Sequence, residues 1–327
     1  MKIVLPRVSE SAELRNGGLK SDPAHRPDLA THAASTRLRR VINDQFRDAC
    51  KKFDQGAYPW LLIENFFDPG ELPETPTTIE PAENDESWWS GAYAALAAID
   101  AIRHRPVSYR CENSGHLFVH LTGLPGEGRL AEKSRAKMRG HTDACSFPFP
   151  SEFKDGDTIS PSPDVVILIG YRNPDGIPTH LAPLASIADK LTPAEIAELG
   201  KPHFSIGSQN TFKTDHILVD APIMSFDSAR GGWSIRFSHK KCTADPDIPA
   251  AVKALEALKE AASASFEAIV VNPGSVFLIN NRSALHGRAE VGGEIGGKSR
   301  WLMRTYANRA DTPAYVEDPD RPFLLSP

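Results

Sequence analysis

Apolar residues recur every three or four positions in several parts of the chain, which is the spacing of one face of an α-helix. The pattern predicts four helices, over residues 36–53, 89–104, 191–200 and 249–266. The first is expected to cover one face of a sheet. The third has clear boundaries, because Thr192 and Glu195 match a capping box and Gly200 follows the last turn.

Continuous apolar runs that end in turn residues predict buried β-strands between these helices. They lie within residues 58–67, 114–126, 164–176 and 275–280. Residues 72–89 hold too many prolines and acidic side chains for regular structure, and their length is typical of a functional loop such as a lid. Residues 1–33 are polar and are expected to be loosely ordered. Residues 34–327 are expected to form one domain.

Composition and charge exclude several classes of protein. The 327 residues carry a net charge of −5 with a pI near 6.1, so nothing indicates binding to nucleic acid or to an anionic membrane. The four cysteines include no CxxC pair, so neither a disulfide framework nor a zinc knuckle is indicated. No apolar run is long enough to span a membrane, and the first residues lack the pattern of a signal peptide. We therefore expect a cytoplasmic protein that acts on a small molecule.

The stretch RGHTDACSFPFP, residues 139–150, places His141 and Asp143 two positions apart. Such a pair alone is usually a solvated turn or a hydrogen-bonded pair. A second histidine, His286, ends the loop that follows the strand predicted at 275–280. Its position in the chain is distant, so only the fold can bring it to the first two residues.

A further strand is predicted in the stretch GKSRWLMRTY, which follows His286. Strand alternation places Arg300 and Arg304 on the same face. Trp301 and Met303 are expected to point to the other face. Two neighbouring arginines on a buried strand are energetically costly unless each meets an anion. Internal salt bridges are the structural alternative to a ligand.

Two imidazoles, one carboxylate and a nearby arginine match the 2-His-1-carboxylate site of non-haem Fe(II) oxygenases. The H-x-D spacing puts two ligands on one side of a strand end, and His286 would be the third. Such a site leaves part of the metal's coordination sphere open. The arginine can act as a bidentate clamp for a carboxylate, such as the far end of 2-oxoglutarate.

With these motifs the sequence resembles the clavaminate synthase and taurine dioxygenase superfamily of Fe(II)/2-oxoglutarate-dependent oxygenases. It is most similar to the clavaminate synthase-like hydroxylases of free amino acids. The resemblance covers residues 108–308 and rests on the stretches YRCENSGHLFVHL, RGHTDACSFPFPSEF, VVILIGYRNPDGIPTHLAPL, VVNPGSVFLINNRSALHGR and SRWLMRTY. It implies an α+β fold, with a double-stranded β-helix (jelly-roll) core flanked by helices.

The resemblance also implies the roles of individual residues in catalysis. His141, Asp143 and His286 would bind Fe(II), and O2 would take an open position on the metal. Arg300 would pair with the distal carboxylate of the cosubstrate 2-oxoglutarate, and Thr179 would add a hydrogen bond to it. Oxidative decarboxylation to succinate and CO2 would then drive oxidation of an unactivated C–H bond.

An amino-acid substrate would have its own contacts by the same resemblance. Arg304 matches the position that binds a substrate's α-carboxylate. Glu112 and Asn113 are candidates for contacting its amino group, and Ser146 is a candidate for lining the pocket. The basic stretch IRFSHKKC, residues 235–242, is interpreted as a solvated patch.

Two departures from the family pattern stand near the distal histidine, where Ser275 and Asn280 replace the usual aspartates. Neither position is a ligand, so the iron site is unaffected. The retained carboxylate of Asp143 favours hydroxylation, because related halogenases have Ala or Gly at that position. Desaturation and ring closure remain open as alternatives.

Other functions stay open on the sequence alone. One is a taurine dioxygenase-like enzyme that oxidises another small carboxylate or a sulfonate. A non-enzymatic alternative is a jelly-roll module that keeps a metal site for sensing or assembly. Four further histidines are interpreted as structural or exposed: His180, His203, His216 and His239.

Overall fold

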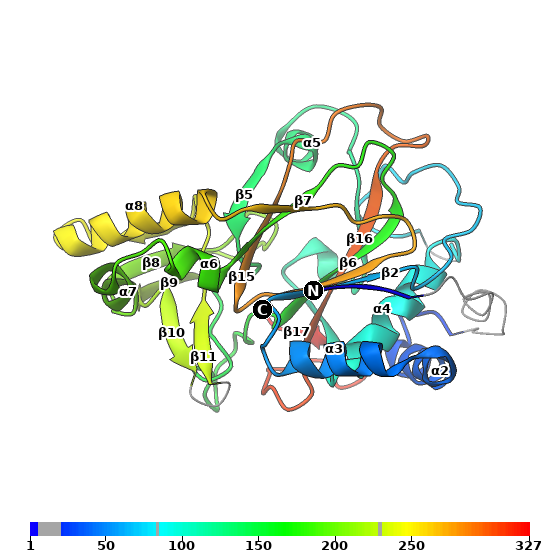
Figure 1. Ribbon diagram of the computed structural model, residues 1–327, viewed down its shortest axis with the longest axis horizontal. Helices are drawn as coiled ribbons and strands as arrows, with labels where there is room; N and C mark the ends of the chain where they lie inside the picture. The colour runs from blue at the N-terminus through cyan, green and yellow to red at the C-terminus, as the bar shows by residue number, and fades with distance from the viewer. Residues whose placement is uncertain (6–20, 83–84, 228–230) are drawn as a thin grey trace.

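The computed structural model describes residues 1–5, 21–82, 85–227 and 231–327, and two sheets form its centre (Figure 1). The larger sheet has the order β1-β2-β14-β6-β16-β3-β17, with β4 paired to β16. Its strands are β1 (Lys2–Val4), β2 (Trp60–Glu64), β3 (His104–Tyr109), β4 (Val119–Leu121), β6 (Val165–Arg172), β14 (Val276–Asn280), β16 (Trp301–Arg309) and β17 (Leu324–Leu325). The smaller sheet has the order β13-β7-β15-β5. Its strands are β5 (Met138–His141), β7 (Thr179–Pro183), β13 (Glu267–Ile269) and β15 (Ala284–Arg288).

An apolar core joins the two sheets. Leu168 of β6 and Leu302 of β16 belong to the same buried cluster as Leu181 of β7 and Ala284 of β15. Because successive strand residues point to opposite faces, each strand contributes every second side chain to this core. The site described below lies at one edge of the same interior.

Three helices cover the other face of the larger sheet (Figure 1): α2 (Pro27–Val41), α3 (Asp44–Asp54) and α4 (Trp89–Ala101). Trp301 and Met303 pack into the buried cluster that these helices share with the sheet. The alternation predicted for this strand is therefore confirmed. Small alanines let α4 pack closely, and Ala94 and Ala95 are fully buried.

The N-terminal part differs from the sequence-based expectation. The helix predicted over 36–53 is two helices, because Ile42 is extended and Asn43 caps α3 by accepting a 2.9 Å hydrogen bond from the Phe46 N–H. Residues 1–33 are not loosely ordered throughout. β1 pairs in parallel with β2, and α2 begins at Pro27, a residue favoured in the first helical turn. Residues 6–20 lie outside the described residues.

A second lobe, on the left in Figure 1, combines short helices with short strands. The helices α7 (Pro193–Leu199) and α8 (Pro249–Ser263) confirm the predictions at 191–200 and 249–266, including the capping box at Thr192. The remaining elements here are α6 (Leu184–Ala188), β8 (Phe204–Gly207), β9 (Ile217–Ala221), β10 (Met224–Asp227), β11 (Gly232–Ile235) and β12 (Cys242–Ala244). Arg236 corrects the interpretation of 235–242 as solvated, because it is buried over the ring of Phe149 and paired with Glu152.

The strands predicted at 58–67, 164–176 and 275–280 are β2, β6 and β14. The run 114–126 forms only the short strand β4, after a 3-10 turn at Asn113–Gly115. The segment 72–89 is irregular until α4 begins, with residues 83–84 outside the described part. It is held in place because Arg172 donates to the Thr75 hydroxyl at 2.7 Å and the His120 N–H donates to the Ile79 carbonyl at 2.7 Å. Among the described residues, no helix is long and apolar enough to cross a membrane.

Candidate metal centre

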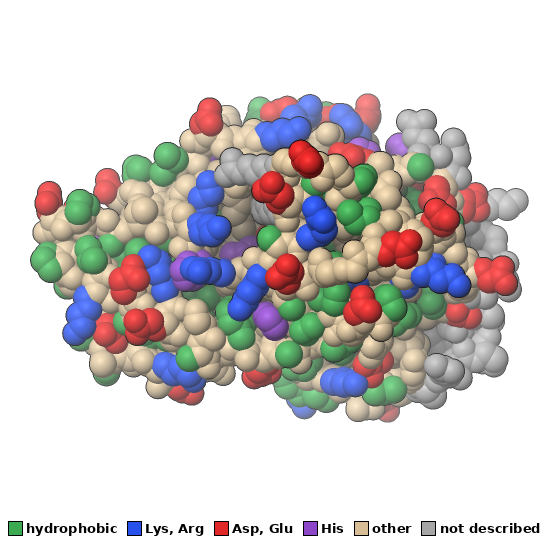
Figure 2. Space-filling model, turned by 90° about the horizontal axis from the view of Figure 1, so that it is seen from above, with side chains coloured by type: hydrophobic (Ala, Val, Ile, Leu, Met, Phe, Trp, Pro, Cys, Tyr) green, Lys and Arg blue, Asp and Glu red, His purple; other side chains and the backbone are tan. Residues whose placement is uncertain are grey.

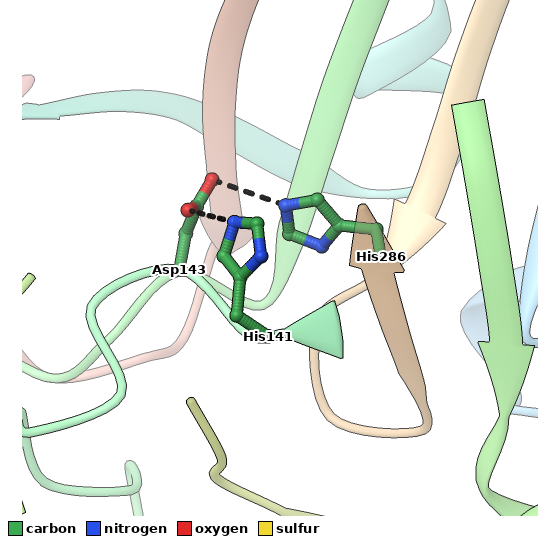
Figure 3. Close-up of side chains that lie close together, drawn as sticks. All are labelled: His141, Asp143 and His286. Atoms are coloured by element: carbon green, nitrogen blue, oxygen red, sulfur yellow. Dashed lines mark ion pairs between the residues drawn. The ribbon is translucent and has the colours of Figure 1, made fainter. Parts of the chain in front are cut away.

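The smaller sheet brings the three predicted ligands together (Figure 3). His141 ends β5 and pairs in register with His286 of β15, so two residues far apart in sequence become direct cross-strand neighbours. Asp143 follows two positions after His141. Its two carboxylate oxygens lie 3.5 Å from the Nε2 atoms of His141 and His286. The three donor atoms all lie within 4.8 Å of one another. His286 belongs to a strand and not, as expected, to a loop.

The protonation states at this centre suit a cation. The Nδ1 atom of His141 lies 2.9 Å from the Arg139 carbonyl, which can only accept, so Nδ1 donates to it and Nε2 is the ring atom available to a metal. Burial, together with the neighbouring His141, lowers the pKa of His286 and keeps that imidazole neutral. Burial opposes the charge of Asp143, but the two imidazoles and Arg304 hold the pKa of its carboxyl well below the ordinary value. Two imidazoles that each direct Nε2 toward one carboxylate form the ligand set of a non-haem Fe(II) site, so the residues fit this metal.

A cavity of about 130 Å³ opens beside the centre, and His141 and Asp143 line it. Figure 2 shows a hollow near the middle of one face, with Lys and Arg side chains around it and His side chains inside it. Ile79 of the 72–89 segment also lines the cavity, which agrees with a covering role for that segment. Space next to the ligands is what a substrate and a cosubstrate require.

Arg304, which lines the cavity, forms a charged cluster with the buried Glu112, which is not itself among the lining residues. Its guanidinium donates to the Glu112 carboxylate at 2.8 Å and lies 3.8 Å from Asp143. The Tyr306 hydroxyl lies 3.1 Å from an Asp143 oxygen and 3.3 Å from a Glu112 oxygen, and it can donate its single proton to one of them at a time. Burial opposes the charge of Arg304, yet Glu112 raises its pKa, so Arg304 remains a cation. Burial raises the pKa of Glu112, and Arg304 acts in the opposite direction.

Arg300 and Thr179 lie close to a second arginine that the sequence analysis missed. Arg288 pairs in register with Thr179 and lines the cavity. Arg300 is not among the residues that line this cavity; it lines a separate, smaller pocket and donates to the Leu121 carbonyl at 3.3 Å. Burial, together with the charge of Arg288, lowers the pKa of Arg300 to about 9. The signal for Arg288 was its position two residues after His286, which places both on one face of β15.

Two other predicted substrate contacts have different surroundings. Asn113 lines the cavity. Ser146 is not among the lining residues, because its hydroxyl bonds the hydroxyl of Ser208 at 2.7 Å. The cavity also includes Gln209 and Thr211, for which no local pattern gave a signal. Of the histidines interpreted as structural, His203 pairs with Glu198 at 2.6 Å.

Comparisons with known proteins agree with this geometry. No family model matches the chain. An L-lysine 3-hydroxylase of Catenulispora acidiphila is 25% identical over 258 residues, which span 75% of this chain and 66% of that protein, just under two thirds of its length. An asparagine oxygenase solved with Fe(II), 2S,3S-3-hydroxyasparagine and succinate superposes with a TM-score of 0.80 at 19% identity, covering 100% of this chain and 99% of that one.

The non-heme iron oxygenase OrfP, solved with Fe and alpha-ketoglutaric acid, gives a TM-score of 0.81 at 19% identity and covers 99% of this chain and 100% of that one. The chain has the fold of these iron oxygenases. The resemblance to free amino acid hydroxylases that the motifs indicated is thereby confirmed. Both sheets and the helical layer described above belong to this shared architecture.

Proposed function

We propose that the protein is an Fe(II)- and 2-oxoglutarate-dependent oxygenase that hydroxylates an unactivated C–H bond of a free amino acid or a close derivative. The two facing sheets would then form the double-stranded β-helix, or jelly roll, of such enzymes. The observation that carries the proposal is the buried Arg304–Glu112 pair beside the triad of His141, Asp143 and His286. The triad is suited to binding a metal, and the Arg304–Glu112 pair is suited to binding a zwitterion.

An amino acid's head group matches the charged cluster in sign and number. Its α-carboxylate would accept hydrogen bonds from Arg304, and its α-ammonium would donate to Glu112. The two protein charges already lie 2.8 Å apart, so a zwitterion replaces one internal ion pair by two without leaving a net charge buried. Asn113 is placed to assist at the same wall. The substrate's side chain would then lie near the open side of the metal centre.

The cosubstrate would occupy the space on the other side of the triad. Arg300 and Thr179 would hold the distal carboxylate of 2-oxoglutarate, with the cavity-facing Arg288 beside them. When bound, iron with 2-oxoglutarate and O2 supplies the oxidation, in which one oxygen atom enters the substrate's C–H bond and the other enters succinate as CO2 leaves. His141, Asp143 and His286 would hold the metal beside the cavity, so the reacting groups would meet there.

The experiment that tests this function is incubation of the purified protein with Fe(II), ascorbate, 2-oxoglutarate and each proteinogenic amino acid. We expect succinate together with a product heavier by one oxygen atom. The matched control is the N-acetylated form of the accepted amino acid, which lacks the ammonium group and should not turn over. A product lighter by two hydrogens would indicate the desaturase alternative. If no amino acid and no small sulfonate stimulates succinate formation, the non-enzymatic metal-binding module is favoured instead.

Replacing Asp143 by glycine should abolish hydroxylation, because the variant lacks the carboxylate ligand and leaves a further metal position open. Asp143→Glu keeps a carboxylate and is the matched control, in which metal binding should persist. Two measurements check this prediction. The first is formation of the hydroxylated product, and the second is binding of azide to the metal-loaded protein, monitored by the absorption spectrum. Full hydroxylation by the glycine variant would show that another carboxylate is the ligand.

A cytoplasmic location and a single domain over residues 34–327 remain predictions of the sequence. The charge of the chain favours neither nucleic acid nor an anionic membrane as a partner.

A further inference from the structure

Asp143 lies in a segment that belongs to neither a strand nor a helix. β5 ends at His141, and Thr142, Asp143 and Ala144 form a buried turn in which Ala144 has φ of 53°. A positive φ is unfavourable for an alanine, so the surroundings must hold this conformation. Buried backbone N–H and C=O groups also require partners.

Two side-chain amides from distant parts of the chain provide those partners. The Asp143 N–H donates to Asn281 Oδ1 at 2.9 Å, and Asn281 Nδ2 donates to the Asp143 carbonyl at 3.0 Å. The Ala144 N–H donates to Gln209 Oε1 at 2.8 Å, and Gln209 Nε2 donates to the Thr142 carbonyl at 3.1 Å. Each amide uses both of its ends, so together they hold the backbone at and around the carboxylate ligand.

Asn281 also links the two halves of the metal centre. It lies in the turn between β14 and β15, the strand that carries His286. A third hydrogen bond, from Asn281 Nδ2 to the Pro163 carbonyl at 2.9 Å, fixes the amide from the other side. The side chain is 1% exposed. The turn that leads into the distal histidine therefore also holds the backbone of the carboxylate ligand.

We propose that Asn281 and Gln209 are positioning residues that hold the Thr142–Ala144 backbone so that the Asp143 carboxylate meets both imidazoles and the metal. The inference rests on the metal centre of the proposed function and assigns two residues to its assembly. Neither residue offers a ligand atom in the triad. They act through Asp143, whose carboxylate must keep one oxygen near each imidazole.

A control in the same chain separates positioning from general stability. Asn173 is also buried, accepts from the Ile177 N–H at 3.0 Å, and donates to the Ile177 carbonyl at 3.1 Å and the Val271 carbonyl at 3.3 Å. It therefore makes the same set of bonds as Asn281, but to a turn that does not line the cavity. Asn173→Ala should lower the melting temperature about as much as Asn281→Ala.

The test measures the affinity of the purified chain for Mn(II) and Co(II) by calorimetry, the Co(II) absorption spectrum, and the melting temperature without metal. We expect Asn281→Ala and Gln209→Met to weaken metal binding about 10- to 100-fold, the usual effect of losing a group that orients a ligand. Their Co(II) spectra should change, whereas Asn173→Ala should keep the wild-type affinity and spectrum. If Asn281→Ala does not fold, Gln209→Met, at the cavity wall, provides the test.

Unchanged metal affinity and spectrum in Gln209→Met and in any folded Asn281→Ala would overturn the positioning role, as would an equal loss of affinity in Asn173→Ala. A wild-type chain that binds no metal would overturn this inference and the metal centre together. A wild-type chain that binds metal but forms no succinate would contradict the proposed reaction alone, and the variants would still decide the positioning role.

Discussion

Replacing His286 by alanine is expected to weaken Fe(II) binding by more than about 100-fold and to abolish turnover. A side chain that binds the metal directly contributes at least as much to metal affinity as a group that only orients it. Loss of such an orienting group typically lowers metal affinity about 10- to 100-fold. His141→Ala should behave in the same way, because the two imidazoles face the same carboxylate from adjacent strands. The measurement is metal affinity by calorimetry under anaerobic conditions, with succinate formation as the second readout.

The matched control for these variants is His203→Ala. That imidazole pairs with Glu198 and has no place in the triad, so its removal should leave metal affinity unchanged. Wild-type affinity in both His141→Ala and His286→Ala would refute the assignment of the metal centre. Loss of affinity in the control as well would indicate general damage to the fold.

The second large effect is expected when Arg304, in β16, and Arg300, directly before it, are replaced one at a time. Truncating one partner of a buried charged pair typically costs about 2–5 kcal/mol of binding free energy. Each loss of about 1.4 kcal/mol lowers affinity tenfold. Arg304→Ala should therefore raise KM for the amino acid about 100-fold, because it removes the proposed carboxylate contact and leaves Glu112 buried without its partner. 2-Oxoglutarate should still be consumed slowly without product, since the metal ligands and Arg300 remain.

Arg300→Ala is expected to show the opposite pattern, with KM for 2-oxoglutarate raised about 100-fold and a smaller effect on the amino acid. Arg300 directly precedes β16 and Arg304 lies within it, four positions apart, which is about 13 Å at the usual rise per residue. Kinetics with each substrate varied in turn provide the measurement. Equal loss of 2-oxoglutarate binding in both variants would favour the taurine dioxygenase-like alternative, in which both arginines bind the cosubstrate.

The structure changes the expectation for the cosubstrate side in one respect. Arg288, like Arg304 but unlike Arg300, lines the cavity together with His141 and Asp143. Arg288 and His286 both lie in β15, two positions apart, so strand alternation places them on one face. Arg300 directly precedes β16, whose register beside β6 is irregular between Trp301 and Leu302, so regular alternation does not fix where its side chain points. A local irregularity of this kind can change the direction in which a side chain points.

Local sequence determined the parts of this protein that depend on short-range geometry. Three such features could be predicted from the sequence, because each involves neighbours within one turn or one strand. They are the capping box at Thr192, the alternation around Met303 and the two-residue spacing of His141 and Asp143. The spacing alone could not identify a metal centre. That step needed His286, which the ligand pattern proposed as the third member and the pairing of β5 with β15 brings beside His141.

Tertiary structure alone decided the contacts between residues far apart in the chain. Glu112 meets Arg304 across 192 positions, and Asn281 meets Asp143 across 138. No local pattern encodes such pairs, because they depend on which strands become neighbours and in which register. The pairing of strands is determined by the burial of whole apolar faces, to which many residues contribute. The chemistry of a single glutamate or asparagine therefore does not indicate which residue it will contact. The ligands of this site could therefore be predicted from sequence motifs, whereas the side chains that hold them in place could be found only in the folded chain.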